Sequence, residues 1–385
     1  MGRFRDALAR PGLSAVAEVK RRSPSAGELR ADADPAALAA AYERAGAAAV
    51  SILVDERFGG SWDDLRAARA ASRVPLLAKG FFSTVEHLRT ASEAGADAAL
   101  LLLRDLDDAA ARRLMGAADA FELEMLVEAH DGEELRRAIA LDAPVIGINA
   151  RDLATFRIDR RVQLELVASA SRDRIVVAES GIDSRAQAAA AELAGADAVL
   201  VGSALMRAPD PAMKLADLIA RPLVKVCGLT REEDVAVAAE AGADLAGFVL
   251  EDASPRRAPC VLPVPEAMLS VAVVVGEPGE HDADLVQLYP EEPGKVRGRD
   301  AVLLRERRQV AQVVDLPWGE DDSTHFERAR ATGGRVMLAG GLGPENVREA
   351  IAAVRPWAVD ASSQLEREPG IKDHDRVRAY VEAAR

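Results

Sequence analysis

The sequence is poor in the residues that would define several other protein classes. It has two cysteines in 385 residues, Cys227 and Cys260, and only 4% aromatic residues. Two cysteines without paired spacings exclude a disulfide framework and are typical of a reducing compartment, so we expect a cytoplasmic protein. The first twelve residues hold no apolar signal core, and no run of 18 apolar residues suggests a membrane-spanning helix.

Basic residues are outnumbered by acidic ones. The chain has 49 Lys and Arg against 63 Asp and Glu, which gives a net charge of −14. This balance argues against nucleic acid or a membrane surface as a partner, although local basic groups and helix N-termini can still bind anionic metabolites. We expect no metal and no organic cofactor, because the histidines lack ligand spacing and are interpreted as structural or surface residues. They are His87, His130, His281, His325 and His374.

What the chain does have is a regular alternation of short apolar runs and Ala-rich amphipathic stretches. Continuous apolar runs between helical patterns are typical of strands buried on both faces of a parallel sheet. In the first 220 residues there are eight such runs, at 15–19, 48–54, 75–78, 98–103, 124–129, 145–148, 175–178 and 198–201. Eight units favour a closed (β/α)8 TIM barrel, with a doubly wound open sheet as the alternative.

The rest of the chain is interpreted as a second, smaller barrel. Ala-Gly-Ala-Asp occurs at 94–97, 194–197 and 241–244, where the glycine is expected to end a helix in the left-handed conformation before a strand. We therefore predict α/β architecture with two tandem (β/α)8 barrels, residues 1–220 and 221–385. Strands are expected at 223–226, 245–250, 270–275, 285–287, 301–304, 312–314, 335–338 and 358–359. The chain between 304 and 312 is too short for a helix, so the second barrel should lack the helix after its fifth strand.

Polar residues follow the predicted strands of the first unit. The carboxyl ends of barrel strands form the active site, and lysines and carboxylates that share one mouth perturb each other's pKa, as acid–base catalysis requires. Gly202 and Ser203 open a turn of the kind that holds phosphate on backbone N–H groups. The polar candidates are Glu18, Lys20, Lys79, Glu128, Asn149, Arg151, Glu179, Ser180 and Ser203.

Six motifs of the first unit resemble the indole-3-glycerol phosphate synthase family. In chain order they are AEVKRRSPSAG (17–27), LLAKGFF (76–82), LVEAH (126–130), GINARDLATF (147–156), AESGI (178–182) and VGSALMR (201–207). The resemblance runs from about residue 4 to residue 220. It implies ring closure of a carboxyphenylamino-deoxyribulose phosphate to indole-glycerol phosphate, with loss of CO2 and water.

The same resemblance implies roles for individual residues. Lys79 would be a general acid at the substrate carbonyl, and Glu128 the general base for the dehydration. Lys20 would hold the anthranilate carboxylate and could share the proton transfer, so which lysine is the main acid stays open. Further catalytic positions are Glu18, Asn149, Glu179 and Ser180, and the expected substrate-binding residues are Ser23, Arg151, Gly181, Gly202 and Ser203.

Two features depart from this family's pattern. The usual Arg-Lys-Asp-Phe is Ala-Lys-Gly-Phe at 78–81, so the lysine remains while a neighbouring charge pair is lost. The N-terminal extension that usually covers the mouth is reduced to residues 1–12. Both departures bear on substrate affinity more than on the type of reaction.

The second unit resembles the phosphoribosylanthranilate isomerase family, strongly at both ends and poorly in the middle. The motifs are KVCGLTREED (225–234), AGADLAGFVLEDASPRR (241–257), VVDLPW (313–318), LAGGLGPENV (338–347) and VDASSQLEREPGIKD (359–373). The implied reaction is an Amadori rearrangement, in which a ribose ring opens and an aminoaldose becomes an aminoketose. It needs an acid at the ring oxygen and a base at the C2 proton.

By this resemblance Cys227 is the base and Asp315 the acid. A lone cysteine on an apolar strand is ordinarily a small buried hydrophobe, and it can act as a base only when ionised. We therefore expect its surroundings to lower its pKa. Arg256 would orient the anthranilate portion, and the other expected substrate-binding residues are Gly340, Gly341, Asp360, Ser362 and Ser363.

Several features of this second family are altered. Gln-Leu-His-Gly is Gln-Leu-Tyr-Pro at 287–290, the Gly-Gly-Thr-Gly loop is Gly-Glu-Asp-Asp-Ser at 319–323, and Ser-Ser-Gly-Val-Glu is Ser-Ser-Gln-Leu-Glu at 362–366. Lost glycines remove close backbone approaches to phosphate, and acidic residues would repel it unless they point away. The second barrel could therefore be a phosphate-ligand sensor or a stabilising partner.

Two other interpretations are weaker. An isomerase of a histidine-pathway aminoaldose would use paired aspartates, which Cys227 opposes, and a non-enzymatic scaffold would make every matched polar position a coincidence. We predict a monomeric bifunctional enzyme that catalyses two consecutive steps of tryptophan biosynthesis on small phosphorylated, anthranilate-derived substrates. The second domain would make the substrate of the first.

Overall fold

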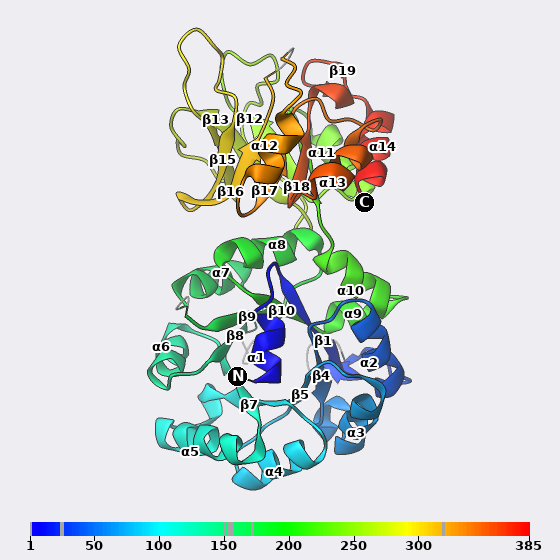
Figure 1. Cartoon of the computed structure of the whole chain (residues 1–385), viewed down its shortest axis with the longest axis vertical. Coiled ribbons are helices and arrows are strands. Elements are labelled where there is room, and N and C mark those ends of the chain that lie inside the picture. The colour runs from blue at the N-terminus through cyan, green and yellow to red at the C-terminus, as the bar shows by residue number, and fades with distance from the viewer. Residues whose placement is uncertain (1, 24–26, 150, 152–157, 171–172, 318–319) are drawn as a thin grey trace. The chain divides into compact units, whose positions relative to one another are not determined.

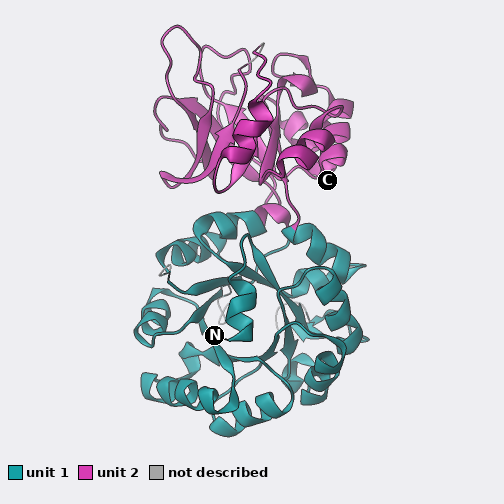
Figure 2. Ribbon diagram, viewed as in Figure 1, with its two compact units in different colours: residues 1–183, 188–219 teal, residues 184–187, 220–385 magenta. Residues whose placement is uncertain are grey.

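The computed structural model describes residues 2–23, 27–149, 151, 158–170, 173–317 and 320–385. The chain divides into two compact units (Figure 2). One contains residues 1–183 and 188–219, and the other contains residues 184–187 and 220–385. No described helix is long and apolar enough to cross a membrane.

The first unit is a closed barrel of eight parallel strands. Each predicted apolar run is a strand, and the open sheet is excluded because β1 pairs with both β4 and β10. The strands are buried almost throughout, since the barrel interior covers one face and the surrounding helices the other. They are β1 (Ser14–Val19), β4 (Ala49–Leu53), β5 (Leu76–Lys79), β6 (Ala98–Leu102), β7 (Glu124–Ala129), β8 (Val145–Asn149), β9 (Ile175–Glu179) and β10 (Ala198–Val201).

Helices surround these strands (Figure 1). Six of them begin after an Asp, Ser or Thr whose side chain accepts a hydrogen bond from a first-turn N–H group, which fixes where each helix starts. A short hairpin, β2 (Arg22–Ser23) with β3 (Gly27–Glu28), follows β1. The helices are α1 (Arg3–Leu8), α2 (Pro35–Arg44), α3 (Trp62–Ala71), α4 (Val85–Glu93), α5 (Asp108–Ala118), α6 (Gly132–Ala140), α7 (Arg160–Ser169), α8 (Arg185–Ala194), α9 (Ser203–Arg207) and α10 (Pro211–Ile219), with 3-10 turns η1 (Glu56–Phe58), η2 (Leu103–Asp105) and η3 (Asp119–Phe121).

The second unit is also a closed eight-stranded barrel, but its sheet is mixed. The fifth strand, β15, is antiparallel to both neighbours, which corrects the expectation of a regular (β/α)8 barrel. The strands are β11 (Leu223–Cys227), β12 (Leu245–Val249), β13 (Leu269–Val275), β14 (Leu285–Tyr289), β15 (Ala301–Arg305), β16 (Arg308–Val314), β17 (Val336–Leu338) and β18 (Ala358–Ala361).

The reversal of β15 explains why this barrel is small. Antiparallel neighbours can be joined by a two-residue turn, whereas parallel neighbours need a crossover. β15 and β16 are joined at Glu306 and Arg307, both with positive φ, as in a type I′ hairpin. The predicted absence of a helix after the fifth strand is confirmed, and no helix occurs anywhere from β12 to β16. The remaining elements are α11 (Glu232–Ala241), α12 (His325–Ala331), α13 (Val347–Val354), α14 (His374–Ala384), η4 (Ser363–Leu365), β19 (Glu366–Glu368) and β20 (Ile371–Lys372).

The repeated Ala-Gly-Ala-Asp motif joins three strands in each of its three copies. Its glycine has φ of 94°, 122° and 92°, which confirms the left-handed helix end. The aspartate carboxylate accepts a hydrogen bond of 2.8 Å from the N–H of the first or second residue of one strand, at Leu76, Val176 or Val224. Its backbone carbonyl accepts the first N–H of another strand, as Asp197 does from Ser14. The aspartates therefore hold the amino ends of the strands in register.

Replacing Asp197 by Ala should leave the Val176 N–H without its partner. We expect the free energy of unfolding to fall by about 1–3 kcal/mol, the cost of losing a hydrogen bond to a charged group. Urea denaturation measures this change. Asp63→Ala is the control, because that side chain is 90% exposed and should change stability by less than about 0.5 kcal/mol. Equal effects of the two substitutions would contradict the structural role of the motif.

Candidate functional site

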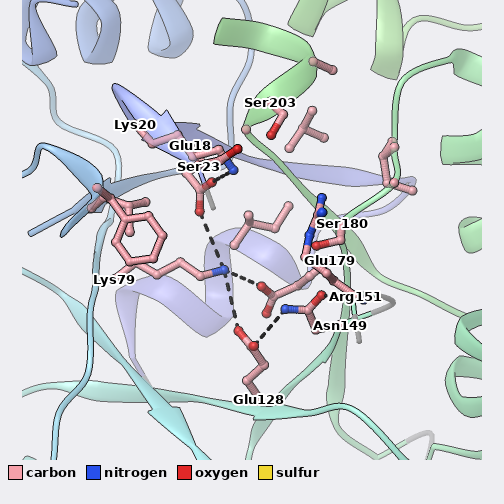
Figure 3. Close-up of a pocket in the computed structure, with 18 of the residues that line it drawn as sticks. Glu18, Lys20, Ser23, Lys79, Glu128, Asn149, Arg151, Glu179, Ser180 and Ser203 are labelled. Atoms are coloured by element: carbon pink, nitrogen blue, oxygen red, sulfur yellow. Dashed lines mark hydrogen bonds and ion pairs between the residues drawn. The ribbon is translucent and has the colours of Figure 1, made fainter. Parts of the chain in front are cut away.

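A partly buried lysine surrounded by three buried carboxylates forms the centre of the first barrel's mouth (Figure 3). Lys79 ends β5, and its Nζ lies 2.5 Å from Glu179 Oε2 at the end of β9. The same nitrogen is 3.6 Å from a carboxylate oxygen of Glu18 on β1 and of Glu128 on β7. Four strands therefore bring these groups together at their carboxyl ends, as barrel geometry predicts.

The charges perturb each other strongly. Burial opposes the charged form of Lys79, but the three carboxylates outweigh it and raise the pKa of the ammonium above its usual value. Burial also opposes ionisation of Glu128, yet Lys79, His130 and Asn149 together lower its pKa to about 2. Burial and the neighbouring carboxylates raise the pKa of Glu179 to about 8. At neutral pH Glu128 is therefore a carboxylate, while Glu179 is the group most ready to hold a proton.

Lys20 and Asn149 extend the cluster. Lys20 Nζ lies 2.6 Å from Glu18 Oε1. Burial raises the pKa of Glu18, but Lys20 and Lys79 outweigh burial and lower it overall. Asn149 Nδ2 donates to Glu128 Oε1 at 2.9 Å, and its Oδ1 accepts the backbone N–H of Arg151 at 3.0 Å. Asn149 thus fixes the orientation of the Glu128 carboxylate.

The backbone around this cluster needs residues without a side chain at two places. A Cβ on Gly202 would lie 2.3 Å from Glu18 Oε1, and one on Gly147 would lie 2.1 Å from Glu179 Oε1. At the end of β9, Ser180 and Gly181 have φ of 66° and 73°, an uncommon conformation for serine. This turn places both residues on the cavity wall.

A cavity of about 190 Å³ brings all the predicted site residues of the first unit together. The lining combines polar and apolar side chains, and among the latter Phe58 and Phe81 are stacked at a centroid distance of 6.3 Å. The Arg57 guanidinium lies 4.0 Å from the centre of the Phe81 ring. This lining suits a ligand that has both an aromatic ring and anionic groups. The predicted residues on the cavity wall are Glu18, Lys20, Ser23, Lys79, Glu128, Asn149, Arg151, Glu179, Ser180, Gly181, Gly202 and Ser203.

Sequence reasoning missed two residues that support this site. Gln163, buried on α7, donates from Nε2 to the carbonyl oxygens of Ile148 and Glu179, at 3.1 and 2.5 Å. His130, interpreted as structural or surface, lies 3.0 Å from Glu128 through Nε2. Nothing in the pattern of α7 marks Gln163, whereas the position of His130 two residues after Glu128 on one strand end was a usable signal.

In the second unit, Cys227 lies at the end of β11 beside a buried cation. Lys225 Nζ is 2.8 Å from Asp360 Oδ2 and donates to Gln287 Oε1 at 2.6 Å. The expectation that the surroundings lower the thiol pKa is wrong: burial raises it, and the opposing effect of Lys225 does not outweigh burial. Asp360 is thus held by Lys225 inside the barrel.

Asp315 follows β16 and is held from two sides. Its Oδ2 accepts a hydrogen bond of 2.6 Å from the Tyr289 hydroxyl and lies 2.7 Å from Arg297 Nη2. The Arg297 guanidinium also lies 4.1 Å from the centre of the Tyr289 ring. Burial raises the pKa of Asp315 despite the neighbouring Arg297, which favours the protonated acid. Tyr289, an altered family position, therefore contacts the predicted acid directly.

The other predicted residues of the second unit also follow its strands. Gly340 and Gly341 come after β17 with positive φ, and Ser362 and Ser363 come after β18. Arg256, which follows β12, is ion-paired with Glu366 at 2.9 Å. Sequence reasoning missed Lys372, which is fully buried, pairs with the same Glu366 at 2.8 Å and donates to the Ser362 carbonyl at 3.2 Å.

The acidic loop at 319–323 is partly neutralised. Gly319 lies outside the described residues. Asp322 is 2.6 Å from Arg299 Nη2 and 3.3 Å from Arg328 Nη1, and it also accepts the N–H of Thr324. Its charge is therefore compensated without a ligand. In the described part of the chain, no group of three or more His, Cys, Asp or Glu side chains is placed to hold a metal ion.

Comparison with known proteins identifies both units. Residues 2–218 match the family model for indole-3-glycerol phosphate synthase, and residues 322–383 match the model for N-(5′-phosphoribosyl)anthranilate isomerase. The indole-3-glycerol phosphate synthase of Streptomyces griseus is 48% identical over 216 residues, which are 56% of this chain and 80% of the relative. That of Mycobacterium avium is 44% identical over 214 residues, covering 55% and 79%.

Solved structures of phosphoribosyl anthranilate isomerases also match part of the chain. A phosphoribosyl anthranilate isomerase from Thermotoga maritima is 30% identical, covers 43% of this chain and 98% of its own, and has a TM-score of 0.33. The isomerase from Thermus thermophilus is 29% identical, covers 42% and 97%, and has a TM-score of 0.35.

The fold and the charged mouth define an enzyme of the TIM-barrel class. More particularly, the chain belongs to the indole-3-glycerol phosphate synthase family and carries a phosphoribosylanthranilate isomerase domain in its second half. These domains belong to two steps of tryptophan biosynthesis.

Gly202→Ala should disrupt the Glu18–Lys20 pair, because the added methyl group would overlap Glu18 Oε1. We expect a loss of stability of about 1–3 kcal/mol from overpacking and at least a tenfold loss of the first barrel's activity, on the order expected when side chains at the mouth are displaced. Thermal denaturation and a rate assay measure both effects. Gly116→Ala on α5, where a Cβ meets no atom within 4 Å, is the control and should be neutral or slightly stabilising. A fully active G202A protein would show that the pair is not needed.

Proposed function

We propose that the second barrel isomerises phosphoribosylanthranilate by an Amadori rearrangement and that the first barrel closes the product to indole-glycerol phosphate. The observation that carries this proposal is the Lys79 cluster, in which carboxylates from three other strands surround one ammonium at 2.5–3.6 Å, so that the pKa of Glu128 is lowered and that of Glu179 is raised. Such a separation supplies one base and one proton holder at neutral pH.

In the first barrel, Lys79 would protonate the substrate carbonyl while a carbon of the aromatic ring bonds to the carbonyl carbon. CO2 then leaves, and Glu128 takes a proton as water is lost. A lysine held by three carboxylates is a weak acid, so the substrate oxygen must displace at least one of them from Nζ. Lys20 stays the alternative acid, since its pairing with Glu18 also places it on the cavity wall.

The anionic ends of the substrate fit the rest of the cavity. Ser23, Gly181, Gly202 and Ser203 would hold the phosphate near the start of α9, and Arg151 would add a positive charge. The stacked rings of Phe58 and Phe81, which line the cavity, would contact the anthranilate ring. Ser180 and Glu179 would orient the sugar hydroxyl groups.

In the second barrel, Asp315 would protonate the ring oxygen and Cys227 would remove the C2 proton. The raised pKa of Asp315 supports the first role. The raised pKa of Cys227 means that only a small fraction of the thiol is ionised at neutral pH, so the buried Lys225 must stabilise the thiolate as it forms. Arg256 would bind the anthranilate carboxylate, Asp360 would position Lys225 beside the thiol, and Gly340, Gly341, Ser362 and Ser363 would hold the phosphate.

The decisive experiment follows phosphoribosylanthranilate through both steps, by its fluorescence and by formation of indole-glycerol phosphate. Cys227→Ser should stop the first step, because a hydroxyl is a far weaker base than a thiolate. Lys79→Ala should stop only the second step.

Other outcomes favour a different function. An intact chain that closes the ring from supplied carboxyphenylamino-deoxyribulose phosphate, but does not consume phosphoribosylanthranilate, would make the second barrel a sensor or structural partner. The low ionised fraction of Cys227 is the observation in favour of that alternative. A chain that catalyses neither step would contradict the whole proposal.

Tyr289→Phe tests the altered family position. Removing the hydroxyl takes away a hydrogen bond that orients Asp315, and we expect the isomerisation rate to fall about tenfold, the size of an ordinary lost hydrogen bond. Ring closure should be unchanged. Tyr380→Phe is the matched control, since that hydroxyl is buried in the same unit without a hydrogen-bond partner among the described residues. An isomerisation rate unaffected by Tyr289→Phe would remove Tyr289 from the site.

We also propose that the enzyme is a cytoplasmic monomer. Both cysteines are free, which suits a reducing compartment, and both sets of proposed site residues come from one chain. Sedimentation equilibrium of the intact chain measures the oligomeric state.

A further inference from the structure

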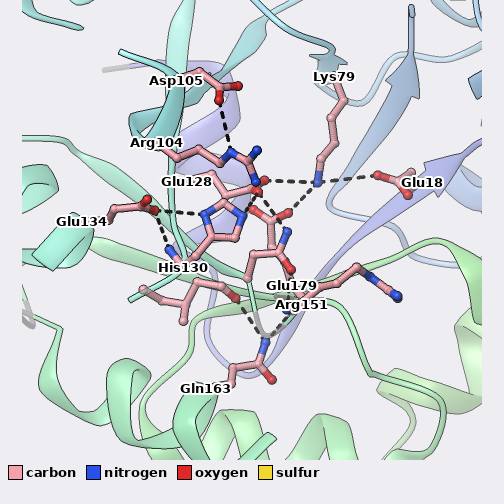
Figure 4. Close-up of polar contacts among 12 residues, drawn as sticks. Glu18, Lys79, Arg104, Asp105, Glu128, His130, Glu134, Arg151, Gln163 and Glu179 are labelled. Atoms are coloured by element: carbon pink, nitrogen blue, oxygen red, sulfur yellow. Dashed lines mark hydrogen bonds and ion pairs between the residues drawn. The ribbon is translucent and has the colours of Figure 1, made fainter. Parts of the chain in front are cut away.

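A histidine links the proposed base of the first barrel to a helix outside the cavity (Figure 4). His130 follows β7, and its side chain is 13% exposed. Its Nδ1 lies 2.9 Å from Glu134 Oε2 on α6, and its backbone N–H donates to the same oxygen at 2.9 Å. The two contacts to one carboxylate fix the position of the imidazole ring.

The other ring nitrogen faces the proposed base. His130 Nε2 lies 3.0 Å from Glu128 Oε1 as an ion pair, without the alignment of a hydrogen bond. The ring therefore stands between two carboxylates. Burial opposes its positive charge, but Glu128 and Glu134 outweigh burial and raise the pKa of His130 to about 9. The other charged groups near this set include Lys79, 3.6 Å from Glu128 Oε2, and the carboxylates of Glu179 and Glu18, which repel that of Glu128. Arg104, which is paired with Asp105 on η2, also lies nearby.

The two oxygens of Glu128 consequently have different surroundings. Oε1 receives the Asn149 amide at 2.9 Å and the charge of His130. Oε2 is buried and has no hydrogen-bond partner among the described residues, with Lys79 Nζ 3.6 Å away. One oxygen is therefore held in place, while the other is available to accept a proton at the mouth.

We propose that His130 is a positioning residue for ring closure: held by Glu134, its imidazolium fixes Glu128 Oε1 as an anion and leaves Oε2 to take the substrate's proton. This inference rests on the proposed function of the first barrel. The chain Glu134–His130–Glu128 extends the site to α6, whose first turn contains Glu134.

The test compares His130→Ala, His130→Gln and Glu134→Gln with the wild-type chain in ring closure from about pH 6 to 10, a range in which Glu128 stays ionised. Because the imidazolium is needed, kcat of the wild-type chain should fall as the pH rises through the His130 pKa of about 9. We expect His130→Ala and His130→Gln to lower kcat about 10–100-fold at pH 7, with little change in KM, and to lack this basic limb. Glu134→Gln should move the basic limb to lower pH, because His130 loses one of the two carboxylates that hold its proton.

His87→Ala, on the first turn of α4, is the control and should leave the profile unchanged. A basic limb that is the same in the wild-type chain and in all three variants, or full activity of His130→Gln, would overturn the proposal, because a purely structural role would not require charge. Should His130→Ala fail to fold, Glu134→Gln and His130→Gln decide the matter.

A separate measurement distinguishes failure of this inference from failure of the proposed function. Nitrogen NMR of the labelled imidazole in the whole chain should show that His130 is protonated at pH 8. In Glu134→Gln a larger fraction of His130 should be neutral at the same pH. A neutral His130 in the wild-type protein overturns the positioning role, whether or not the chain closes the indole ring. Absence of ring closure with a protonated His130 overturns the proposed function, and with it the substrate-directed part of this inference.

Discussion

The ammonium group of Lys79 is the interaction on which the first barrel's mouth depends. Three buried carboxylates point at it from three other strands, and burial of such charges is costly unless each is compensated. One ammonium cannot neutralise three carboxylates, so the remaining charge is shared with Lys20 and with His130. The closed barrel makes this concentration of charge sustainable, because each group is fixed by a strand end and cannot move away. Unequal proton affinities at the mouth follow directly from that crowding.

Periodicity and turn residues were sufficient to predict the first barrel. Every apolar run became a strand with ends within two residues, because strands buried on both faces leave a continuous apolar signal. The second barrel was predicted in number of strands but not in direction. An apolar run such as 301–304 is the same in a parallel and an antiparallel strand. The reversal depends on the connections on either side of β15, a helix-free segment before it and the turn at Glu306 and Arg307 after it, and neither turn residue is a turn-favouring glycine or asparagine.

Site residues were predictable where a polar or ionisable side chain directly follows or ends a predicted strand. Lys79 and Glu128 follow that rule, and so do Cys227 and Asp315. Gln163 does not, since it reaches the strand carbonyls from a helix, and no spacing in the sequence relates it to them. Whether the pKa of the Cys227 thiol is raised or lowered also depends on how deeply the thiol is buried, and a sequence pattern does not measure burial. Contacts between elements distant in sequence are therefore what the structure added.

The reversed strand β15 shows where a barrel can be shortened without loss of its mouth. Every parallel strand delivers its carboxyl end to the mouth, but β15 delivers its amino end, where Asp300 accepts the backbone N–H of Asp315. The carboxyl end of β15, which could have carried a reacting side chain, is therefore absent from the mouth. In its place is Asp300, which supports the neighbouring Asp315. A domain of this kind can lose two crossover connections at a strand whose carboxyl end carries no site residue. The number of strands whose carboxyl ends carry site residues therefore limits how short the chain of such an enzyme can be.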